Sequence, residues 1–281
     1  MAKKSPEARI FVRTDYTIEQ RRLGKVPVDR ISSDYTIIAI LDGDCRITTN
    51  GETDELHSGS IILLNPNQTC SIAAAKNLVE ALFVFLPAVY VYQVAGRLQP
   101  VNNSELLFRE LSFNGTDRAQ FLVETISEEL SSDAAGRTVV IDATISQLTV
   151  YLLRNMMNAR RSLTLELSRV GVVDRRLRRA IEFMHLRSAE ELSLSAIASE
   201  AFLSAYHFAR LFKRLTGQTP HNYLANIRID RAKQLLATSD LPISSIASQV
   251  GYENQSHFAK LFRSSTGLTP KEYRAGAIQR Q

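Results

Sequence analysis

The sequence predicts an α+β protein of two domains: an N-terminal antiparallel β-barrel with packed helices, then an all-α domain with two helix-turn-helix units. Three observations lead to this prediction. Short apolar runs separated by turn residues fill residues 36–86, helical periodicity starts after residue 101, and the C-terminal third contains an internal repeat. The expected boundaries are 1–157 for the first domain, 158–172 for a linker and 173–281 for the second domain.

The composition is that of a soluble globular protein, with 44% hydrophobic and 22% charged residues. No run of eighteen apolar residues occurs, and no apolar segment follows the basic start, so we expect neither a membrane span nor a secretion signal. Cys45 and Cys70 are too few for a disulfide scaffold and fit a reducing cytoplasm. We expect them to be small core residues rather than a redox switch.

Positive charge is concentrated in the second predicted domain. Residues 174–281 contain 16 Lys and Arg against 9 Asp and Glu, whereas residues 1–173 contain 18 against 20. A basic domain beside a near-neutral one is typical of a polyanion-binding module, although other domains also have such a surplus.

The segment 36–86 predicts short antiparallel strands. Apolar runs cover Thr36–Leu41, Cys45–Thr49, Gly59–Pro66, Cys70–Ala73 and Val79–Leu86, and Asn50-Gly51 is a strong signal for a hairpin turn. Many such strands favour a small barrel. Two helices should follow. The second has an apolar stripe that either packs on the barrel or joins two subunits: Ile141, Ile145, Leu148, Leu152 and Met156.

The internal repeat is the strongest feature of the sequence. His207–Lys213 (HFARLFK) returns as His257–Arg263 (HFAKLFR), and the following segments Thr216–Pro220 and Thr266–Pro270 also match. Ile197-Ala198-Ser199 upstream corresponds to Ile246-Ala247-Ser248, with one extra residue before the second histidine.

Each copy predicts a short helix, a turn and a second helix. Gly251 suits the turn, while Ser204 and Asn254 are placed as N-caps of the second helices. Glycines 217 and 267 should end those helices. Between the copies, Pro220 to about Ala237 predicts one helix of roughly 25 Å. It could hold the two second helices about one DNA turn apart, ~34 Å. Apolar residues at i, i+3, i+4 spacing should be buried in the second helices: Phe208, Leu211, Phe212, Phe258, Leu261 and Phe262.

On these residues, the segment from about residue 173 to residue 274 closely resembles the DNA-binding domain of the AraC/XylS family of transcriptional regulators. The N-terminal half resembles the cupin-like sensor domain of that family at Gly43, Gly51, Gly59 and Asn65-Pro66. The resemblance implies a sequence-specific transcription activator that binds double-stranded DNA, contacts RNA polymerase, forms a homodimer and is not an enzyme. It also favours the dimerisation role for the Ile141–Met156 stripe. The matching C-terminal motifs are Ser195–Ala198, Leu203-Ser204, Phe208–Lys213, Gly217–Pro220, Arg228–Ala232, Leu235-Leu236, Ile246-Ala247, Gly251-Tyr252, Phe258–Pro270 and Tyr273-Arg274.

Outward positions of the repeated helices are the candidate DNA contacts. Arg210 suits a bidentate contact to guanine and Gln255 a contact to adenine. Lys213, Arg214 and Arg263 are better placed as phosphate anchors, and His207 and His257 could instead be packing residues. The full candidate set is Ala205, Tyr206, Ala209, Arg210, Lys213, Arg214, Gln255, Ser256, His257, Ala259, Lys260 and Arg263.

A small-molecule effector is expected inside the barrel. The alternative is regulation by a protein partner, which an exposed apolar patch on 89–98 would favour. The residues of the N-terminal half argue against a cupin enzyme, because this half has a single histidine, His57, and no catalytic constellation. We therefore expect no metal and no cofactor. The candidate effector-lining residues are Ile38, Ile40, Ile47, Ile62, Leu64 and Phe83.

Overall fold

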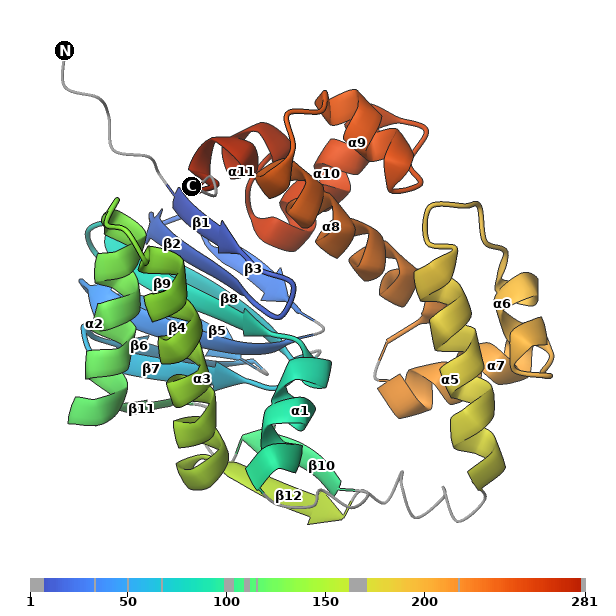
Figure 1. Cartoon of the computed structure of the whole chain (residues 1–281), viewed down its shortest axis with the longest axis horizontal. Coiled ribbons are helices and arrows are strands. Elements are labelled where there is room, and N and C mark those ends of the chain that lie inside the picture. Colours follow the sequence, from blue (N-terminus) through green and yellow to red (C-terminus); the bar gives the residue numbers. More distant parts are fainter. Residues whose placement is uncertain are drawn as a thin grey trace.

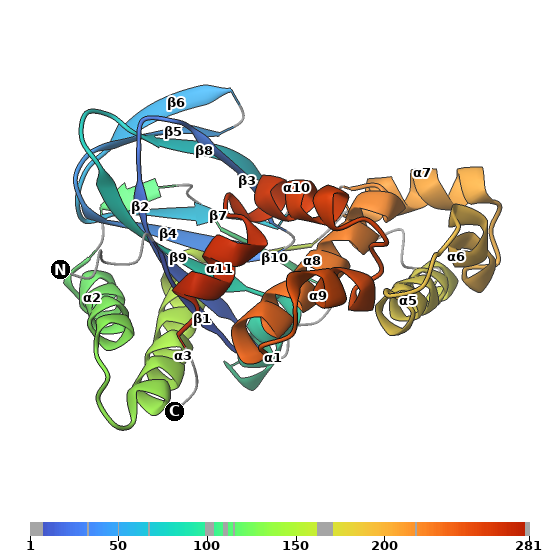
Figure 2. The ribbon, with the colours of Figure 1, turned by 90° about the horizontal axis from the view of Figure 1, so that it is seen from above.

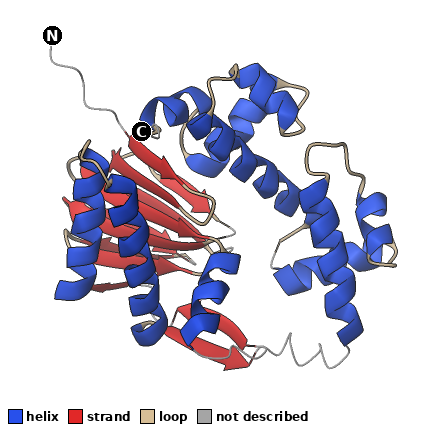
Figure 3. Cartoon of the chain, viewed as in Figure 1, coloured by secondary structure: helices blue, strands red, loops and turns tan. Residues whose placement is uncertain are grey.

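The computed structural model of the chain (Figure 1) describes residues 8–32, 34–49, 51–66, 68–98, 104–108, 112–114, 116–161, 171–216 and 218–278. Strands and three helices form an N-terminal domain, and helices alone form the C-terminal domain (Figure 3). The predicted α+β class is therefore confirmed.

Two large antiparallel sheets, with a separate two-stranded one, form the N-terminal domain. The larger has the order β1-β2-β9-β4-β7-β11 and the smaller the order β3-β8-β5-β6. The strands of the larger sheet are β1 (Ala8–Val12), β2 (Thr17–Leu23), β9 (Val79–Leu86), β4 (Tyr35–Asp42), β7 (Ser60–Leu64) and β11 (Ser112–Asn114). Those of the smaller sheet are β3 (Val28–Ile31), β8 (Thr69–Ala74), β5 (Cys45–Thr49) and β6 (Glu52–Leu56).

The two sheets face each other but do not close into the predicted barrel. Among the described strands every ladder lies within one sheet, so each sheet keeps two edges. Alternation of apolar and polar residues shows which face of a strand is buried. Because this alternation is the same in a closed barrel and in two facing sheets, the sequence could not distinguish them. The predicted hairpin is present, because Thr49 pairs with Glu52 around Gly51, whose φ is 86°; Asn50 lies outside the described residues.

The outer face of the larger sheet is covered by α1 (Ala88–Leu98), α2 (Asp117–Ser131) and α3 (Arg137–Asn155) (Figure 1). The α3 stripe Ile141, Ile145, Leu148 and Leu152 is only 0–2% exposed and packs in this core, with Met156 partly buried against it. The prediction that the stripe joins two subunits is therefore wrong. A sheet face needs a cover, and helical periodicity cannot say whether the cover belongs to the same chain.

Two other expectations also change. In the segment 89–98, Val91, Val94 and Ala95 are buried, so these three side chains form no exposed patch for a partner protein. Strand β12 (Met157–Arg161) pairs with β10 (Ser104–Phe108), so the N-terminal domain continues through Arg161 into the predicted linker. The next described element, α5, begins at Gly171.

The C-terminal domain contains the two predicted helix-turn-helix units, α6–α7 and α9–α10, joined by α8. Leu224 near the start of α8 packs in the core of the first unit, whereas Ile229, Ala232 and Leu236 pack in the core of the second. One rigid helix therefore belongs to both cores. The helices are α5 (Gly171–Leu186), α6 (Leu194–Glu200), α7 (Ala205–Thr216), α8 (Pro220–Thr238), α9 (Ile243–Gln249), α10 (Gln255–Thr266) and α11 (Pro270–Gly276).

The second unit also packs against the N-terminal domain. Ala8 and Ile10 of β1 are buried in the same cluster as Phe262 and Tyr273. The Ile278 amide donates a hydrogen bond of 2.8 Å to the Ile10 carbonyl, beside a parallel bridge between Ile10 and Ala277. The end of the described chain thus adds to the edge of the larger sheet, as Figure 1 shows.

Charged side chains lie in the same interface. The Lys233 ammonium of α8 is 2.9 Å from Asp230 Oδ1 and 5.6 Å from the centre of the Phe85 ring in β9. Burial alone would lower the pKa of Lys233, but Asp230 and Glu19 raise it above its usual value. The lysine therefore stays cationic in the contact between the domains.

Candidate DNA-binding surface and effector pocket

The first candidate recognition helix, α7, turns a polar face to the solvent. Its N-terminus is capped by Ser204, whose Oγ accepts a bond of 3.3 Å from the His207 amide. Phe208 and Phe212 are fully buried, which forces Tyr206, Arg210 and Lys213 outward. Tyr206 is a large aromatic side chain, yet it is 76% exposed. Ala205 and Ala209 are half-buried at the edge of this face. The Arg214 side chain and the predicted helix end at Gly217 lie outside the described residues.

The second candidate helix, α10, is built in the same way. Asn254 caps it by accepting a bond of 3.0 Å from the His257 amide, and Gly267 ends it with φ 74°, as the sequence predicts. Phe258 and Phe262 are buried. The remaining predicted contacts are exposed, except for half-buried Ala259: Gln255, Ser256, His257, Lys260 and Arg263.

Both histidines of the repeat lie on the surface. His207 and His257 are exposed, so neither belongs to a core, although the His257 ring lies 6.0 Å from the ring of Tyr252. Among the described residues, Arg210, Lys213 and Lys260 form no ion pair with any carboxylate. Their charges are therefore available to an anion outside the protein.

Helix α8 separates the two candidate helices, which lie near its opposite ends (Figure 2). Nineteen residues at 1.5 Å each give a helix of about 28 Å, close to the ~34 Å of one DNA turn. The exposed faces of α7 and α10 together form the candidate DNA-binding surface.

The predicted effector-lining residues form a core instead of a cavity wall. Ile38, Ile40, Ile47, Ile62, Leu64 and Phe83 are each at most 3% exposed and pack together between the two sheets. Cys45 and Cys70 belong to the same cluster, and burial raises the pKa of the Cys45 thiol to about 11. Of the six predicted residues, only Ile40 borders the pocket that lies on the other side of the larger sheet.

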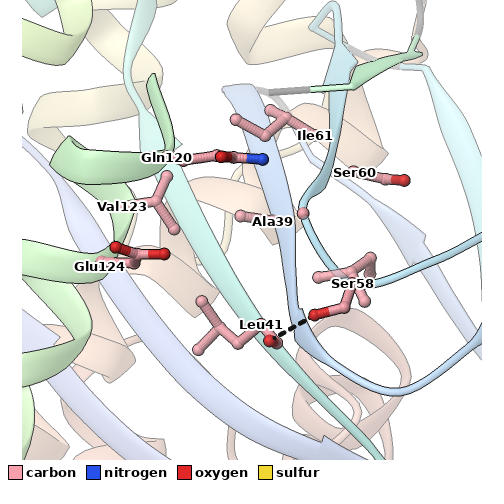
Figure 4. Close-up of a pocket in the computed structure, with 10 residues that line it drawn as sticks. Ala39, Leu41, Ser58, Ser60, Ile61, Gln120, Val123 and Glu124 are labelled. Carbon is pink, nitrogen blue, oxygen red and sulfur yellow. Dashed lines mark hydrogen bonds between the residues drawn. The ribbon is translucent and has the colours of Figure 1, made fainter. Parts of the chain in front are cut away.

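A pocket of about 270 Å³ lies under α2, on the outer side of the larger sheet (Figure 4). Gly59 in its wall has φ 88°, and a Cβ there would stand 2.9 Å from Gln120 Nε2. The Ser58 hydroxyl donates to the Leu41 carbonyl at 2.8 Å. The lining residues are Ala39, Ile40, Leu41, Ser58, Gly59, Ser60, Ile61, Gln120, Val123 and Glu124.

The chemistry of this pocket is mixed. Ala39, Ile61 and Val123 provide an apolar wall, and the side chains of Gln120 and Glu124 have no hydrogen-bond partner among the described residues. Such a pocket suits a small molecule with an apolar body and a hydrogen-bond donor. Sequence reasoning missed it, because Gln120 and Glu124 occupy ordinary polar positions of an amphipathic helix.

Two other classes of site are absent from the described residues. No three His, Cys, Asp or Glu side chains there gather in a way that could hold a metal ion. None of the described helices combines the length and the apolar composition needed to cross a bilayer.

Comparison with known proteins gives matches along nearly the whole chain. The model of the AraC-like ligand binding domain matches residues 18–202, and that of a helix-turn-helix domain matches residues 197–276. The probable transcriptional regulator LumQ of Photobacterium leiognathi is 40% identical over 67 residues, 24% of this chain, and the match spans 27% of LumQ. The lactose operon transcription activator of Staphylococcus xylosus is 24% identical over 239 residues, 82% of either chain.

Solved structures agree in fold. ToxT from Vibrio cholerae O395 is 15% identical with a TM-score of 0.63, covering 95% of this chain and 99% of ToxT. Wild-type ToxT from strain SCE256, solved with an unsaturated fatty acid bound, is 14% identical with a TM-score of 0.57, covering 96% of this chain and 99% of that one. At this identity the likeness establishes the two-domain fold alone. Because the ligand-binding model matches more than half of the chain and a helix-turn-helix model most of the rest, the protein belongs to the AraC family of transcriptional regulators.

Proposed function

We propose that the protein is a sequence-specific transcription activator that binds double-stranded DNA through α7 and α10. The observation that supports this most is the pair of exposed polar faces held at the two ends of α8, each fixed by buried phenylalanines beneath it. Two exposed polar faces joined by a helix of about 28 Å suit two successive segments of a duplex.

Roles follow from the chemistry of the side chains at the predicted contact positions. Arg210 contacts guanine and Gln255 contacts adenine, because their forked groups match those base edges. Tyr206, Ser256, His257 and Lys260 complete the base-contacting set, and Ala205, Ala209 and Ala259 offer methyl groups to thymine. Lys213, Arg214 and Arg263 bind phosphates and set the orientation on the duplex.

Selection of bound sequences from a random pool, followed by affinity measurements across a salt series, tests this proposal. A selected site should bind at least about a thousandfold tighter than random DNA, with affinity falling as salt rises. Transcription from a promoter with that site, with purified RNA polymerase, then tests activation and the polymerase contact. Equal affinity for selected and random DNA would refute the proposal.

The effector of this protein is, in our proposal, a small molecule bound in the pocket under α2. The support is the pocket itself, the match to a ligand-binding family model, and ToxT, which has been solved with an unsaturated fatty acid bound. Glu124 and Gln120 would hold a hydrogen-bond donor of the ligand, and Val123 and Ala39 its apolar body.

Thermal melting of the full chain with a panel of small amphipathic amines and alcohols tests this site. A ligand at 100 times its Kd should stabilise the fold by ~2.7 kcal/mol. Val123→Trp fills the pocket and should remove the shift, whereas Val139→Trp, at an exposed position of α3, should keep it. A shift that survives Val123→Trp places the ligand elsewhere.

We also propose that the protein acts as a homodimer, as the family resemblance implies. With the α3 stripe buried, any such interface uses another surface. Sedimentation of the full chain, with and without its selected DNA site, measures the oligomeric state directly, and a monomer under both conditions would refute this.

A further inference from the structure

Helix α5, which packs in the core of the first helix-turn-helix unit, is followed by a turn that touches the second unit outside the candidate DNA contacts. This turn, 187–190, lies against the turn at Gly251 and Tyr252. A Cβ on Gly251 would stand 2.8 Å from the Ala189 carbonyl oxygen and 3.0 Å from that of Ser188. Since real Cβ atoms do not come this close to backbone oxygens, only glycine allows the two turns to meet.

Arg228 of α8 joins the same two turns with one side chain. Its Nε donates to the Ser188 carbonyl at 2.7 Å, and its Nη2 donates to the Glu190 carbonyl at 2.8 Å. The guanidinium carbon lies 5.3 Å from the centre of the Tyr252 ring. A planar fork that donates in two directions and stacks on a ring fixes an orientation in a way that the flexible ammonium of lysine cannot.

The contact is buried on one side. Ser188 is 1% exposed and Tyr252 is 7% exposed, whereas Arg228 is half-buried and Ala189 and Glu190 are exposed. Burial raises the pKa of Tyr252, although the positive charge of Arg228 acts in the opposite direction. The Ser188 hydroxyl further donates to the His185 carbonyl at 3.3 Å, which holds the first turn in shape.

Comparison of the two repeats shows what is special about the second turn. Phe202 occupies in the first unit the place of Gly251, and it also has positive φ, 55° against 89°. Phe202 is 68% exposed, and the guanidinium carbon of Arg179 in α5 lies 5.8 Å from the centre of its ring. The helix-turn-helix turn itself therefore accepts a side chain at this place, and glycine is required in the second copy by the contact with the first unit.

We propose that Arg228 and Gly251 set the orientation of the second unit relative to the first and so determine which spacing between the two contacted DNA segments the protein accepts. Arg228 is a positioning residue, since it touches neither candidate DNA-binding face. This inference rests on the proposed function. One added base pair moves a segment by ~3.4 Å and turns it by roughly 35° around the duplex, so a rigid pair of units must discriminate between spacings.

The experiment uses the full chain and a DNA site selected by the wild type, with variants of the site that gain or lose one base pair between the two contacted segments. Wild-type affinity should fall about tenfold or more when the spacing changes, because one segment is then lost. Arg228→Met should bind the three sites within about threefold of each other. The matched control is Arg231→Met, at an exposed position of the same helix, which should keep the wild-type discrimination.

A second variant and a measurement without DNA distinguish a change in orientation from loss of folding. Gly251→Ala forces the two turns apart and should relax spacing discrimination as Arg228→Met does, whereas Phe202→Ala at the equivalent place should not. Spin labels on Tyr206→Cys and Ser256→Cys report the distance between α7 and α10, whereas the native cysteines, Cys45 and Cys70, are buried. The distance distribution should broaden in Arg228→Met and in Gly251→Ala.

The outcomes separate this inference from the proposed function. The inference is overturned if Arg228→Met and Gly251→Ala keep the wild-type spacing discrimination and an unchanged distance distribution. The proposed DNA-binding function is unaffected by that result. Absence of sequence-specific binding by the wild type refutes the proposed function, and the inference with it.

Discussion

Gly276 lies so close to Ala8 that a β carbon at residue 276 would stand 2.6 Å from the Ala8 carbonyl oxygen. The two residues belong to different domains, so this approach brings α11 against β1. Together with the hydrogen bond from Ile278 to Ile10, it ties the second helix-turn-helix unit to the larger sheet.

Replacing Gly276 with valine should therefore separate α11 from β1, because the side chain would collide with backbone that cannot move aside. Hydrogen exchange of the amides in 8–12 and 276–278 should become faster than in the wild type. The control Ala275→Val changes an exposed neighbour and should leave exchange unchanged. Equal protection in both variants would mean that α11 is not held by this contact.

Arg210→Ala and Lys213→Ala should have different effects on DNA binding. Loss of the Arg210 fork should cost ~1–3 kcal/mol at the selected site and relax preference at one base pair. Loss of Lys213 should weaken selected and random DNA alike and reduce the salt slope by about one. Affinities measured over a salt series distinguish the two effects, and the opposite result would exchange the two roles.

Leu148 should behave as a core residue and not as part of a subunit interface. Leu148→Ala leaves a cavity under the larger sheet and should lower the free energy of unfolding by about 2–5 kcal/mol. Val140→Ala on the exposed side of α3 should change it by less than about 0.5 kcal/mol. Denaturant titration measures both. A Leu148→Ala protein as stable as the wild type but shifted to monomer would restore the interface interpretation.

His185, an exposed side chain that packs edge-on against Tyr223, should add a small acid sensitivity to the C-terminal domain. Partial burial lowers the pKa of His185 below its usual value, although Asp230 opposes the shift. The folded domain thus favours the neutral ring, so this contribution to stability is complete above about pH 6.5 and is lost as the pH falls below it. The free energy of unfolding should fall less between pH 7.5 and 5.5 in His185→Gln than in the wild type. Asn222→Gln, at an exposed position of α8, should retain the wild-type slope.

The sequence predicts the local structure of the C-terminal domain closely, because each signal there acts within a few residues. Asn254 caps α10, Gly267 ends it, and Pro220 starts α8, each through bonds or dihedral angles of its own turn. The sequence did not decide between a surface and a packing position for His207 and His257, and the structure shows both side chains exposed.

Features that depend on distant segments were not predictable in the same way. The stripe Ile141–Leu152 shows that one face of α3 is buried, but not that the larger sheet buries it. Likewise, nothing near Arg228 in the sequence indicates that Ser188 and Tyr252 lie on either side of it. The pocket under α2 depends on Gly59 meeting Gln120, two residues whose separate sequence contexts are ordinary.

The contact between β1 and the end of α11 has a consequence for synthesis on the ribosome. β1 is an edge strand of the larger sheet, and its partner segment 276–278 is the last part of the described chain to be made. At ordinary elongation rates the nascent chain keeps that edge open for roughly 10–50 s. Unpaired strand edges are templates for association between chains. Newly made molecules should therefore be most prone to aggregate before α11 has emerged and packed against that edge.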